Sequence, residues 1–400
     1  MHSSPLLQPG TGDAGGMNVY LDRLSRTMAG RGIDVTVFTR TADPGLPPVS
    51  EIVSGYRVVH IDAGPASKLK IDDMPAHVAA FSSGVIDWIQ ARGHTYDLVH
   101  AHYWLSGRTG VRMKDELGIP LANSFHTLGR VKDAARRKDE AISSTERLLT
   151  EAEIIRNSDC VVASTPFEFD DLLEHYGAAP EQLCISPPGV DHDVFQRGNT
   201  ADARRKLGFS DEKIVLFVGR IQAHKGTDVA LHTIAELLSS RGRDAGDVRL
   251  HVVGGASGTH GAAELVECHE IIARHDLSDH VRFFDPQPHS VLADHYRAAD
   301  VLIVPSRSES FGLVAAEAQA CGTPVVASNT GGLPYVVSAS ESGLLVDDHD
   351  PKAFAAAVAA ILDYPSFAHR LSDGAVAFSQ RFSWDATATR LLELYEGITA

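Results

Sequence analysis

The sequence has 400 residues, of which 44% are hydrophobic and 22% are charged, and its formal net charge is −16. A chain of this length usually exceeds what one hydrophobic core supports, so two domains are expected. The acidic balance excludes a general nucleic-acid or anionic-membrane binder, because no basic stripe is present to neutralise a long run of phosphates.

The chain opens with the glycine-rich segment HSSPLLQPGTGDAGGMN, which leads directly into a predicted helix at 19–31. The apolar strand that normally precedes such a loop is missing, so we expect the first strand of this domain to be absent from the sequence. After the helix, short apolar runs alternate with helix-length segments, which predicts a parallel α/β sheet. The predicted strands lie at 34–40, 56–61, 97–103, 120–127 and 159–165.

A second series of strands begins after Pro187, Pro188 and Gly189. Its strands are predicted at 213–219, 248–254, 281–284, 301–305, 324–328 and 343–346. This pattern predicts two doubly wound, Rossmann-like domains, at 1–188 and 189–380, followed by a C-terminal segment at 381–400 that carries an amphipathic helix.

The strongest local signal for chemistry is PSRSESFGLVAAEAQACGTPVVAS. A buried strand ends at Pro305, Glu309 follows in the loop, and Glu317 lies about two turns inside the next helix. Carboxylates at the carboxyl edge of a parallel sheet suit paired hydroxyl groups, such as those of a sugar and a ribose. The alternative is that Glu309 is a charge at a helix N-terminus and Glu317 lies on a solvated face.

A pair of cations follows another buried strand, in IVLFVGRIQAHKG. Arg220 offers a planar fork of donors and Lys225 a point charge, which together suit a diphosphate leaving group. A surface loop that forms salt bridges is the alternative interpretation.

Glycines also precede the first helix, where Gly15 and Gly16 leave N–H groups and the positive end of the helix dipole available to an anion. Helix capping is the alternative there. In HAHYWLSG and NSFHTLGRVK, the ends of two strands place Tyr103, His126 and Thr127 at one edge of the first sheet. For His126, a structural histidine is the alternative.

Together, the segments QPGTGDAGGMNVY, AHYWLSG, FHTLGRVK, IVLFVGRIQAHKG and SFGLVAAEAQACGTPVVAS resemble the retaining GT-B glycosyltransferases of the sucrose-synthase-like family. The resemblance covers essentially the whole chain. It implies two facing Rossmann-like domains with parallel sheets and a C-terminal helix that crosses back to the first domain. The motifs are most similar to members that transfer N-acetylglucosamine from UDP-GlcNAc to 1D-myo-inositol 3-phosphate, which release UDP in the first step of mycothiol biosynthesis.

The resemblance also implies roles for single residues. Arg220 and Lys225 would bind the diphosphate. Glu309 would bind the donor sugar and Glu317 the ribose hydroxyls. His126 would stand beside the anomeric carbon, where its carbonyl or ring stabilises oxocarbenium charge. Further donor contacts are expected from Gln8, Pro9, Gly16 and Gln287. Acceptor contacts are expected from His2, Asp13, Ala14, Gly15, Gly16, Met17, Asn18, Lys70, Tyr103, Thr127 and Arg147.

The sequence departs from the family pattern at two places. The family's phosphate-binding lysine falls on Ile71 in a gapless match of AGPASKLKIDDMP, and Lys70 is the neighbouring substitute. The family's DPRP turn reads DPQP, with Gln287 in place of arginine.

Retention in this fold is explained by a front-face displacement, in which the leaving phosphate oxygen takes the acceptor proton. No side-chain nucleophile and no metal cofactor are then required for catalysis. The resemblance also implies a structural Mg²⁺ held by backbone oxygens and a homodimer. The oxygens are those around Tyr296, Arg297, Ala299 and Thr323.

Other functions are left open by these residues. The nearest is a related GT-B transferase that uses another acceptor or nucleotide sugar, and another is a non-catalytic nucleotide-sugar-binding module. The stretch VVGGASGTHG lacks the spacing and the acidic residue of a dinucleotide fingerprint, which argues against an oxidoreductase. No apolar run spans a bilayer and no signal sequence opens the chain, so a cytoplasmic protein without a membrane partner is expected.

Overall fold

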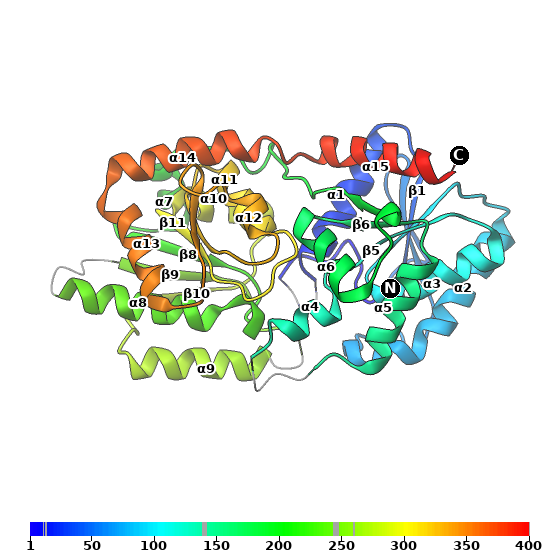
Figure 1. Ribbon diagram of the computed structural model, residues 1–400, viewed down its shortest axis with the longest axis horizontal. Helices are drawn as coiled ribbons and strands as arrows, with labels where there is room; N and C mark the ends of the chain where they lie inside the picture. Colours follow the sequence, from blue (N-terminus) through cyan, green and yellow to red (C-terminus); the bar gives the residue numbers. More distant parts are fainter. Residues whose placement is uncertain (11, 13, 138–141, 243–247, 259–260, 400) are drawn as a thin grey trace.

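The computed structural model describes residues 1–10, 12, 14–137, 142–242, 248–258 and 261–399. These residues form two α/β domains that lie side by side along the long axis of the molecule (Figure 1). The predicted two-domain α/β architecture with parallel sheets is confirmed.

The sheet of the N-terminal domain is in two parts, with strand orders β1-β3-β2 and β4-β5-β6-β7. Every pair of strands is parallel except β2 and β3, which form a hairpin at Gly55, whose φ of +83° suits a tight turn. No strand occurs among the described residues before the first helix, and β1 and β4 are both edge strands. The strands are β1 (Val35–Arg40), β2 (Val49–Val53), β3 (Tyr56–Ile61), β4 (Val99–His102), β5 (Leu121–Ser124), β6 (Cys160–Ala163) and β7 (Leu183–Ile185).

Helices connect these strands and cover the two parts of the sheet (Figure 1). They are α1 (Gly16–Gly30), α2 (Val78–Arg92), α3 (Trp104–Leu117), α4 (Gly129–Ala134), α5 (Thr145–Asn157) and α6 (Pro166–Tyr176), with 3₁₀ turns η1 (Ile71–His77) and η2 (Pro180–Gln182). Two of the strands, β2 and β7, were not predicted. The first, VSEIV, is an edge strand whose polar and apolar residues do not alternate, and the second has only three residues.

The C-terminal domain has one parallel six-stranded sheet, in the order β10-β9-β8-β11-β12-β13. The strands are β8 (Lys213–Val218), β9 (Val248–Val253), β10 (Val281–Phe284), β11 (Val301–Val304), β12 (Val325–Ser328) and β13 (Gly343–Val346). The helices are α7 (Thr200–Leu207), α8 (Thr227–Arg241), α9 (Gly261–Arg274), α10 (His289–Ala298), α11 (Leu313–Ala320), α12 (Leu333–Val336), α13 (Pro351–Asp363) and α14 (Pro365–Ser379), with the 3₁₀ turn η3 (Ala223–Lys225).

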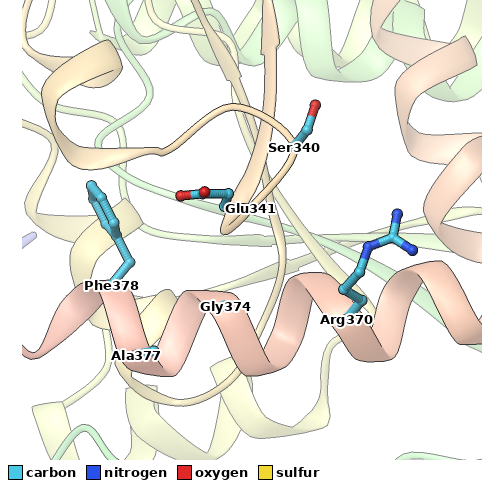
Figure 2. A pocket seen from close by; sticks show the side chains of 6 residues that line it. All are labelled: Ser340, Glu341, Arg370, Gly374, Ala377 and Phe378. Carbon is cyan, nitrogen blue, oxygen red and sulfur yellow. The ribbon is translucent and has the colours of Figure 1, made fainter.

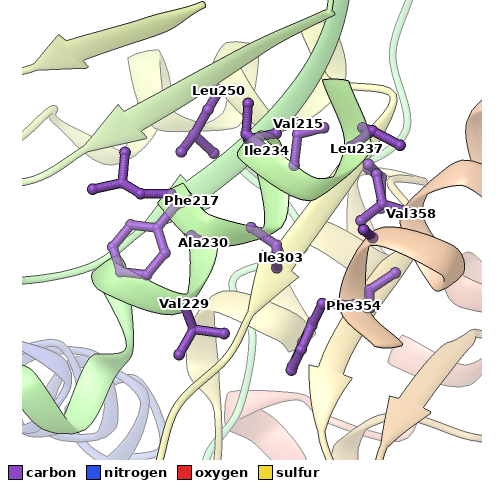
Figure 3. Packing of buried hydrophobic residues seen from close by; sticks show 14 of the residues in the cluster. Val215, Phe217, Val229, Ala230, Ile234, Leu237, Leu250, Ile303, Phe354 and Val358 are labelled. Atoms are coloured by element: carbon purple, nitrogen blue, oxygen red, sulfur yellow. The ribbon is translucent and has the colours of Figure 1, made fainter. Parts of the chain in front are cut away.

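The core of this domain lies between the sheet and helices α8 and α13 (Figure 3). Phe217 of β8 and Ile303 of β11 pack with Ile234 of α8 and Phe354 of α13, and all four are buried. Full burial of one such side chain contributes about 1.5–3 kcal/mol. The near-continuous apolar runs of these strands follow from helices covering both faces of the sheet.

The last helix, α15 (Trp384–Thr399), leaves the C-terminal domain and packs on the N-terminal domain (Figure 1). Trp384 and Leu391 form a buried cluster with Tyr20 and Leu24 of α1. The predicted crossing of the C-terminal helix is therefore confirmed. Where the chain crosses, Val190 donates its N–H to the Phe382 carbonyl at 3.2 Å, so the two connecting segments lie side by side.

Candidate active site

The predicted site residues of the two domains meet at the junction between the domains. Gln8 donates through Nε2 to the Pro286 carbonyl at 3.0 Å, and the Ser310 hydroxyl donates to the His126 carbonyl. A Cβ added to Gly16 would lie 3.2 Å from the Leu313 side chain. Predicted residues of the N-terminal domain therefore lie against the segments of the C-terminal domain that carry Gln287 and Glu309, at a place that we call the domain junction.

A lysine and a carboxylate are paired at this junction. Lys225 lies in η3, shortly after β8, and Glu309 lies in the loop after β11. Lys225 Nζ is 2.7 Å from Glu309 Oε2, and both side chains are largely covered, at 21% and 15% exposure. The guanidinium of Arg220 lies against Gly15, because its Nε is 3.6 Å from where a Cβ on Gly15 would stand. Arg220 and Lys225 therefore both lie at the domain junction. This position disagrees with the alternative interpretation, a surface loop that forms salt bridges.

The Glu309 loop is fixed by a second glycine-containing turn. Gly332 donates its N–H to the Glu309 carbonyl at 2.8 Å. Gly331 has a φ of +54°, and a Cβ there would collide with the same carbonyl oxygen. Only glycine allows this close approach. The NTGGLP segment therefore fixes the backbone at Glu309.

Glu317 is buried within α11, at 5% exposure. The Tyr296 hydroxyl donates to its Oε2 at 2.9 Å. Burial raises the pKa of the Glu317 carboxyl to about 8, because removal from water penalises its charged form. The solvated-face interpretation of Glu317 is wrong, and a carboxyl held here is suited to receive hydroxyl groups.

The loop before α1 is shaped by its own hydrogen bonds. Asn18 is buried, accepts from the Gly15 N–H at 2.9 Å and donates to the Ser3 hydroxyl and the Ser4 carbonyl, both at 2.7 Å. The Ala14 carbonyl accepts from the Gly10 N–H at 2.9 Å. Gly16 is left exposed at the start of the helix, and Met17 packs on the N-terminal core. Asp13, also predicted to contact the acceptor, lies outside the described residues.

Two residues at strand ends have a left-handed backbone that is uncommon outside glycine. Tyr103 follows β4 with a φ of +74°, and His126 follows β5 with a φ of +59°. Such positions cost about 1–3 kcal/mol and cluster at functional sites. His126 is half-buried, and burial lowers the pKa of its ring to about 4, so the imidazole is neutral near pH 7.

The predicted acceptor residues gather around Tyr103. The His2 ring lies 4.8 Å from the Tyr103 ring, and the Arg147 guanidinium lies 5.4 Å from its centroid. Arg147 also donates to the Thr127 carbonyl at 3.0 Å. Its orientation is fixed by Glu151, a fully buried carboxylate 2.8 Å from Nε, which the sequence analysis did not single out. The Arg147 guanidinium therefore lies beside the residues that are predicted to bind the acceptor.

A lysine that was not predicted for the site, Lys68, reaches the glycine-rich loop. Lys68 and Lys70 are both exposed, and Lys70 immediately precedes η1. Lys68 Nζ occupies the space that a Cβ on Gly12 would need. Ile71, where the family pattern has its lysine, packs against the N-terminal core. The ammonium of Lys68 therefore lies against the glycine-rich loop.

The remaining predicted donor residues lie at the edge of the junction. Pro9 is half-buried beside Gln8, and the Gln287 amide donates to the Asp285 carbonyl at 2.8 Å. Gln287 thus shapes the DPQP turn through a local bond. The turn itself contacts the N-terminal loop through Pro286.

One of the backbone oxygens predicted to hold Mg²⁺, that of Tyr296, is engaged within the protein. The Tyr296 carbonyl accepts from the Thr323 hydroxyl at 2.6 Å and from the Ala299 N–H at 3.1 Å. Arg297 brings a cation to the same place and pairs with Asp294 at 3.1 Å. Mg²⁺ favours carboxylate and water oxygens in an octahedron. In the described part of the chain, no three His, Cys, Asp or Glu residues gather as metal ligands.

Two surface hollows of the C-terminal domain lie away from the junction. One, of about 560 Å³, opens between a loop and α14 and is lined by Ser340, Glu341, Arg370, Gly374, Ala377 and Phe378 (Figure 2). The other, of about 620 Å³, lies over α8 and α9. Neither is lined by a predicted site residue.

Comparison with known proteins places the chain among glycosyltransferases. The Glycosyl transferase 4-like domain matches residues 15–189, and Glycosyl transferases group 1 matches residues 199–377. D-inositol 3-phosphate glycosyltransferase 2 of Catenulispora acidiphila is 46% identical, over 99% of this chain and 93% of its own length. The chain belongs to this family of glycosyltransferases. Another member, from Corynebacterium diphtheriae, is 43% identical over 99% of this chain and 92% of its own.

Solved structures confirm the GT-B fold of the family. Sucrose-phosphate synthase of Thermosynechococcus elongatus superimposes with a TM-score of 0.91 at 33% identity, covering 99% of this chain and 97% of its own. HepE of Anabaena, solved in complex with UDP-glucose, superimposes with a TM-score of 0.78 at 19% identity, covering 98% of each chain. The second likeness concerns the fold alone. Of the helices that the structure describes, none is sufficiently long and apolar to cross a membrane.

Proposed function

We propose that this glycosyltransferase transfers N-acetylglucosamine from UDP-GlcNAc to 1D-myo-inositol 3-phosphate, with retention of the anomeric configuration and release of UDP. The observation that carries the proposal is the set of relatives at 42–46% identity over nearly the full chain, all called D-inositol 3-phosphate glycosyltransferases. The convergence of Arg220, Lys225, Glu309 and Arg147 on the domain junction supports it, because each has a role in this reaction.

The donor side supplies charge to the departing diphosphate. Arg220 and Lys225 would bind its oxygens, and Lys225 would share its charge between Glu309 and the phosphate. Glu309 would accept from the sugar hydroxyls, and Glu317 from the ribose. Because two fixed cations stabilise the leaving group, the proposed reaction needs no metal cofactor. Turnover that survives EDTA treatment is the corresponding test.

The acceptor hydroxyl would attack from the same face as the leaving group. The leaving phosphate oxygen takes the hydroxyl proton while the bond from the anomeric carbon to that oxygen breaks. His126 lies at the junction, where its carbonyl accepts from Ser310. The neutral ring then stands next to developing positive charge without repelling it.

The decisive experiment measures UDP release from UDP-GlcNAc with inositol 3-phosphate, with free inositol, with a hexose phosphate and with no acceptor. Turnover confined to inositol 3-phosphate supports the proposal. Turnover on the hexose phosphate instead would support a related transferase, a candidate favoured by the 33% identity to sucrose-phosphate synthase. UDP binding without turnover on any acceptor would indicate that the protein is a non-catalytic nucleotide-sugar-binding module.

Lys68 is expected to contribute to acceptor affinity. The Lys68→Ala variant should raise the KM for inositol 3-phosphate by about 10- to 100-fold, the cost of losing one hydrogen bond to a charged group. Lys70→Ala, two residues along the chain and exposed, serves as the matched control and should change the KM by less than about threefold. Equal effects of the two variants on the KM would contradict this assignment.

Tyr296 is expected to hold the Glu317 carboxyl in place for the ribose. Tyr296→Phe leaves a buried carboxyl without its donor, so UDP affinity and the free energy of unfolding should fall by about 1–3 kcal/mol. Isothermal titration with UDP and urea unfolding measure the two quantities. Tyr335→Phe, in the same domain, is the control. Unchanged UDP affinity in the Tyr296 variant would show that Glu317 does not bind the nucleotide.

We also propose that the protein is a homodimer and works in the cytoplasm. The family resemblance supports the first, and the supply of nucleotide sugars supports the second. Light scattering with a chain mass of 42.9 kDa distinguishes monomer from dimer.

A further inference from the structure

A line of imidazole rings runs behind the domain junction from helix α15 to His126. His100 and His102 occupy alternate positions of β4, and their ring centroids are 4.2 Å apart. His102 Nδ1 lies 2.9 Å from His126 Nε2. At the other end, His100 Nδ1 lies 2.5 Å from the Tyr395 hydroxyl of α15, and its Nε2 lies 2.9 Å from the Ser124 hydroxyl.

The three histidines are neutral near pH 7. Burial lowers the pKa of His100 to about 3 and that of His126 to about 4, and it lowers the pKa of His102 well below its usual range. A neutral imidazole has one N–H donor and one bare nitrogen. Of the two nitrogens in contact, His102 Nδ1 and His126 Nε2, one therefore carries a proton and the other accepts it. The tautomer of one ring therefore determines the tautomer of the other.

The His126 ring is also confined by packing. The Tyr20 ring meets it edge-on at 5.2 Å and lies 5.5 Å from the His102 ring. The His126 backbone, at a φ of +59°, is held by the hydrogen bond from Ser310 to its carbonyl. With Nε2 engaged by His102, the His126 Nδ1 is the ring atom that has no protein partner among the described residues.

We propose that His102 is a positioning residue that holds the His126 ring in one orientation and one tautomer for the transfer, with support from α15 through Tyr395 and His100. The inference rests on the proposed function, because that function places His126 beside the reacting carbon. At metal sites, partners that orient a functional side chain typically change affinity or activity by about 10- to 100-fold when they are mutated, and His102 stands in the same relation to His126.

Two substitutions of His102 separate positioning from packing. His102→Leu removes the bond to His126, and kcat should fall about 10- to 100-fold while the KM for UDP-GlcNAc and the affinity for UDP stay within about twofold. His102→Asn places an amide near the position of Nδ1 and should recover most of the lost kcat. Tyr395→Phe should lower kcat by a smaller factor, about two- to fivefold. Tyr364→Phe, an exposed tyrosine, is its control.

A double-mutant cycle tests whether His102 acts through His126. Once His126→Ala has been made, adding His102→Leu should lower kcat by less than about twofold. Independent losses that multiply would overturn the proposal, as would a fall in UDP affinity that parallels the fall in kcat.

Long-range ¹H–¹⁵N NMR spectra of the histidine rings provide a readout that does not depend on turnover. His126, assigned by comparison with His126→Asn, should show one tautomer in the unmodified protein and a mixture in His102→Leu. An unchanged tautomer in that variant would overturn the inference. If the tautomer changes as expected but inositol 3-phosphate is not glycosylated by the unmodified protein, the proposed function alone has failed.

Discussion

The Lys225→Ala variant is expected to lose about two to three orders of magnitude in kcat. Lys225 Nζ is 2.7 Å from Glu309 Oε2, at the junction where the diphosphate is proposed to leave. Removal of one fixed charge or donor from a developing anion costs about 3–4 kcal/mol of barrier. The variant also leaves the largely covered Glu309 carboxylate without its cation, which repels the leaving diphosphate further.

The control for this variant is Lys206→Ala. Lys206 belongs to the same domain, pairs with Asp294 at 3.2 Å and is 64% exposed, so its loss should leave kcat unchanged. UDP release under saturating UDP-GlcNAc measures kcat, and titration with UDP measures product affinity. If Lys225→Ala weakened only the binding of UDP-GlcNAc and left kcat unchanged, Lys225 would bind the substrate but would not stabilise the leaving group in the transition state.

Acid should unfold the protein between about pH 6.5 and pH 4. Burial lowers the pKa of His251 and His295 to about 4 in the C-terminal domain, and that of His126 to about 4 in the N-terminal domain. The unfolded chain binds protons at these histidines from about pH 6.5 downward, while the folded chain resists until about pH 4. The contribution of these three histidines to stability is therefore complete above pH 6.5, is lost through this window, and levels off below about pH 4.

The expected loss is large relative to the stability of a typical domain. Lowering the pKa of a buried histidine such as His251 or His295 from 6.5 to about 4 corresponds to about 3 kcal/mol, against about 5–15 kcal/mol for a whole domain. The opposite effect comes from Glu168 and Glu317, whose raised pKa values of about 7 and about 8 contribute stability that is lost as pH rises from about 4.5. More histidines than carboxyls have shifted pKa values, so acid destabilisation dominates. The histidines whose pKa burial lowers are His2, His100, His102, His126, His224, His232, His251, His289 and His295.

Urea unfolding at several pH values between 4 and 8 measures this dependence. His251→Leu and His295→Leu should each flatten the curve, because both rings are buried among Phe209 and Phe284. His369→Leu, at a side chain that is 78% exposed, should leave the slope unchanged. A protein as stable at pH 4.5 as at pH 7 would show that these rings are protonated without cost.

The strands and the GT-B fold could be predicted because buried parallel strands such as KIVLFV are almost continuously apolar, and their ends carry glycine and charged residues. The motif residues Arg220, Lys225, Glu309 and Glu317 could be placed at sheet edges by the same logic. The short strand β7 could not, because three residues carry no periodicity. The division of the N-terminal sheet into two parts also could not be predicted, because it depends on pairing between strands that are distant in the sequence.

Contacts between side chains that are distant in the sequence also could not be predicted. Lys68 rather than Lys70 reaches Gly12, because the path of an irregular loop decides which lysine faces it. Ser310 meets the His126 carbonyl only once the domains are side by side. Glu151 is a structural partner of Arg147, and nothing in its own neighbourhood marks it. Tyr296 was predicted only for a backbone oxygen, and the bond from its hydroxyl to Glu317 could not be predicted.

The chain passes between the domains twice, and the two passages are bound to each other. Val190 pairs with Ser383, and Gly189 lies so close to the backbone of Trp384 that a Cβ there would collide with it. Two domains joined by a single connecting segment can bend at it and also rotate about it. Two connecting segments that are bound side by side resist the rotation, so they favour bending about one hinge axis. The two halves of the site, one in each domain, would then separate and return along the same arc, which preserves their alignment from one catalytic cycle to the next.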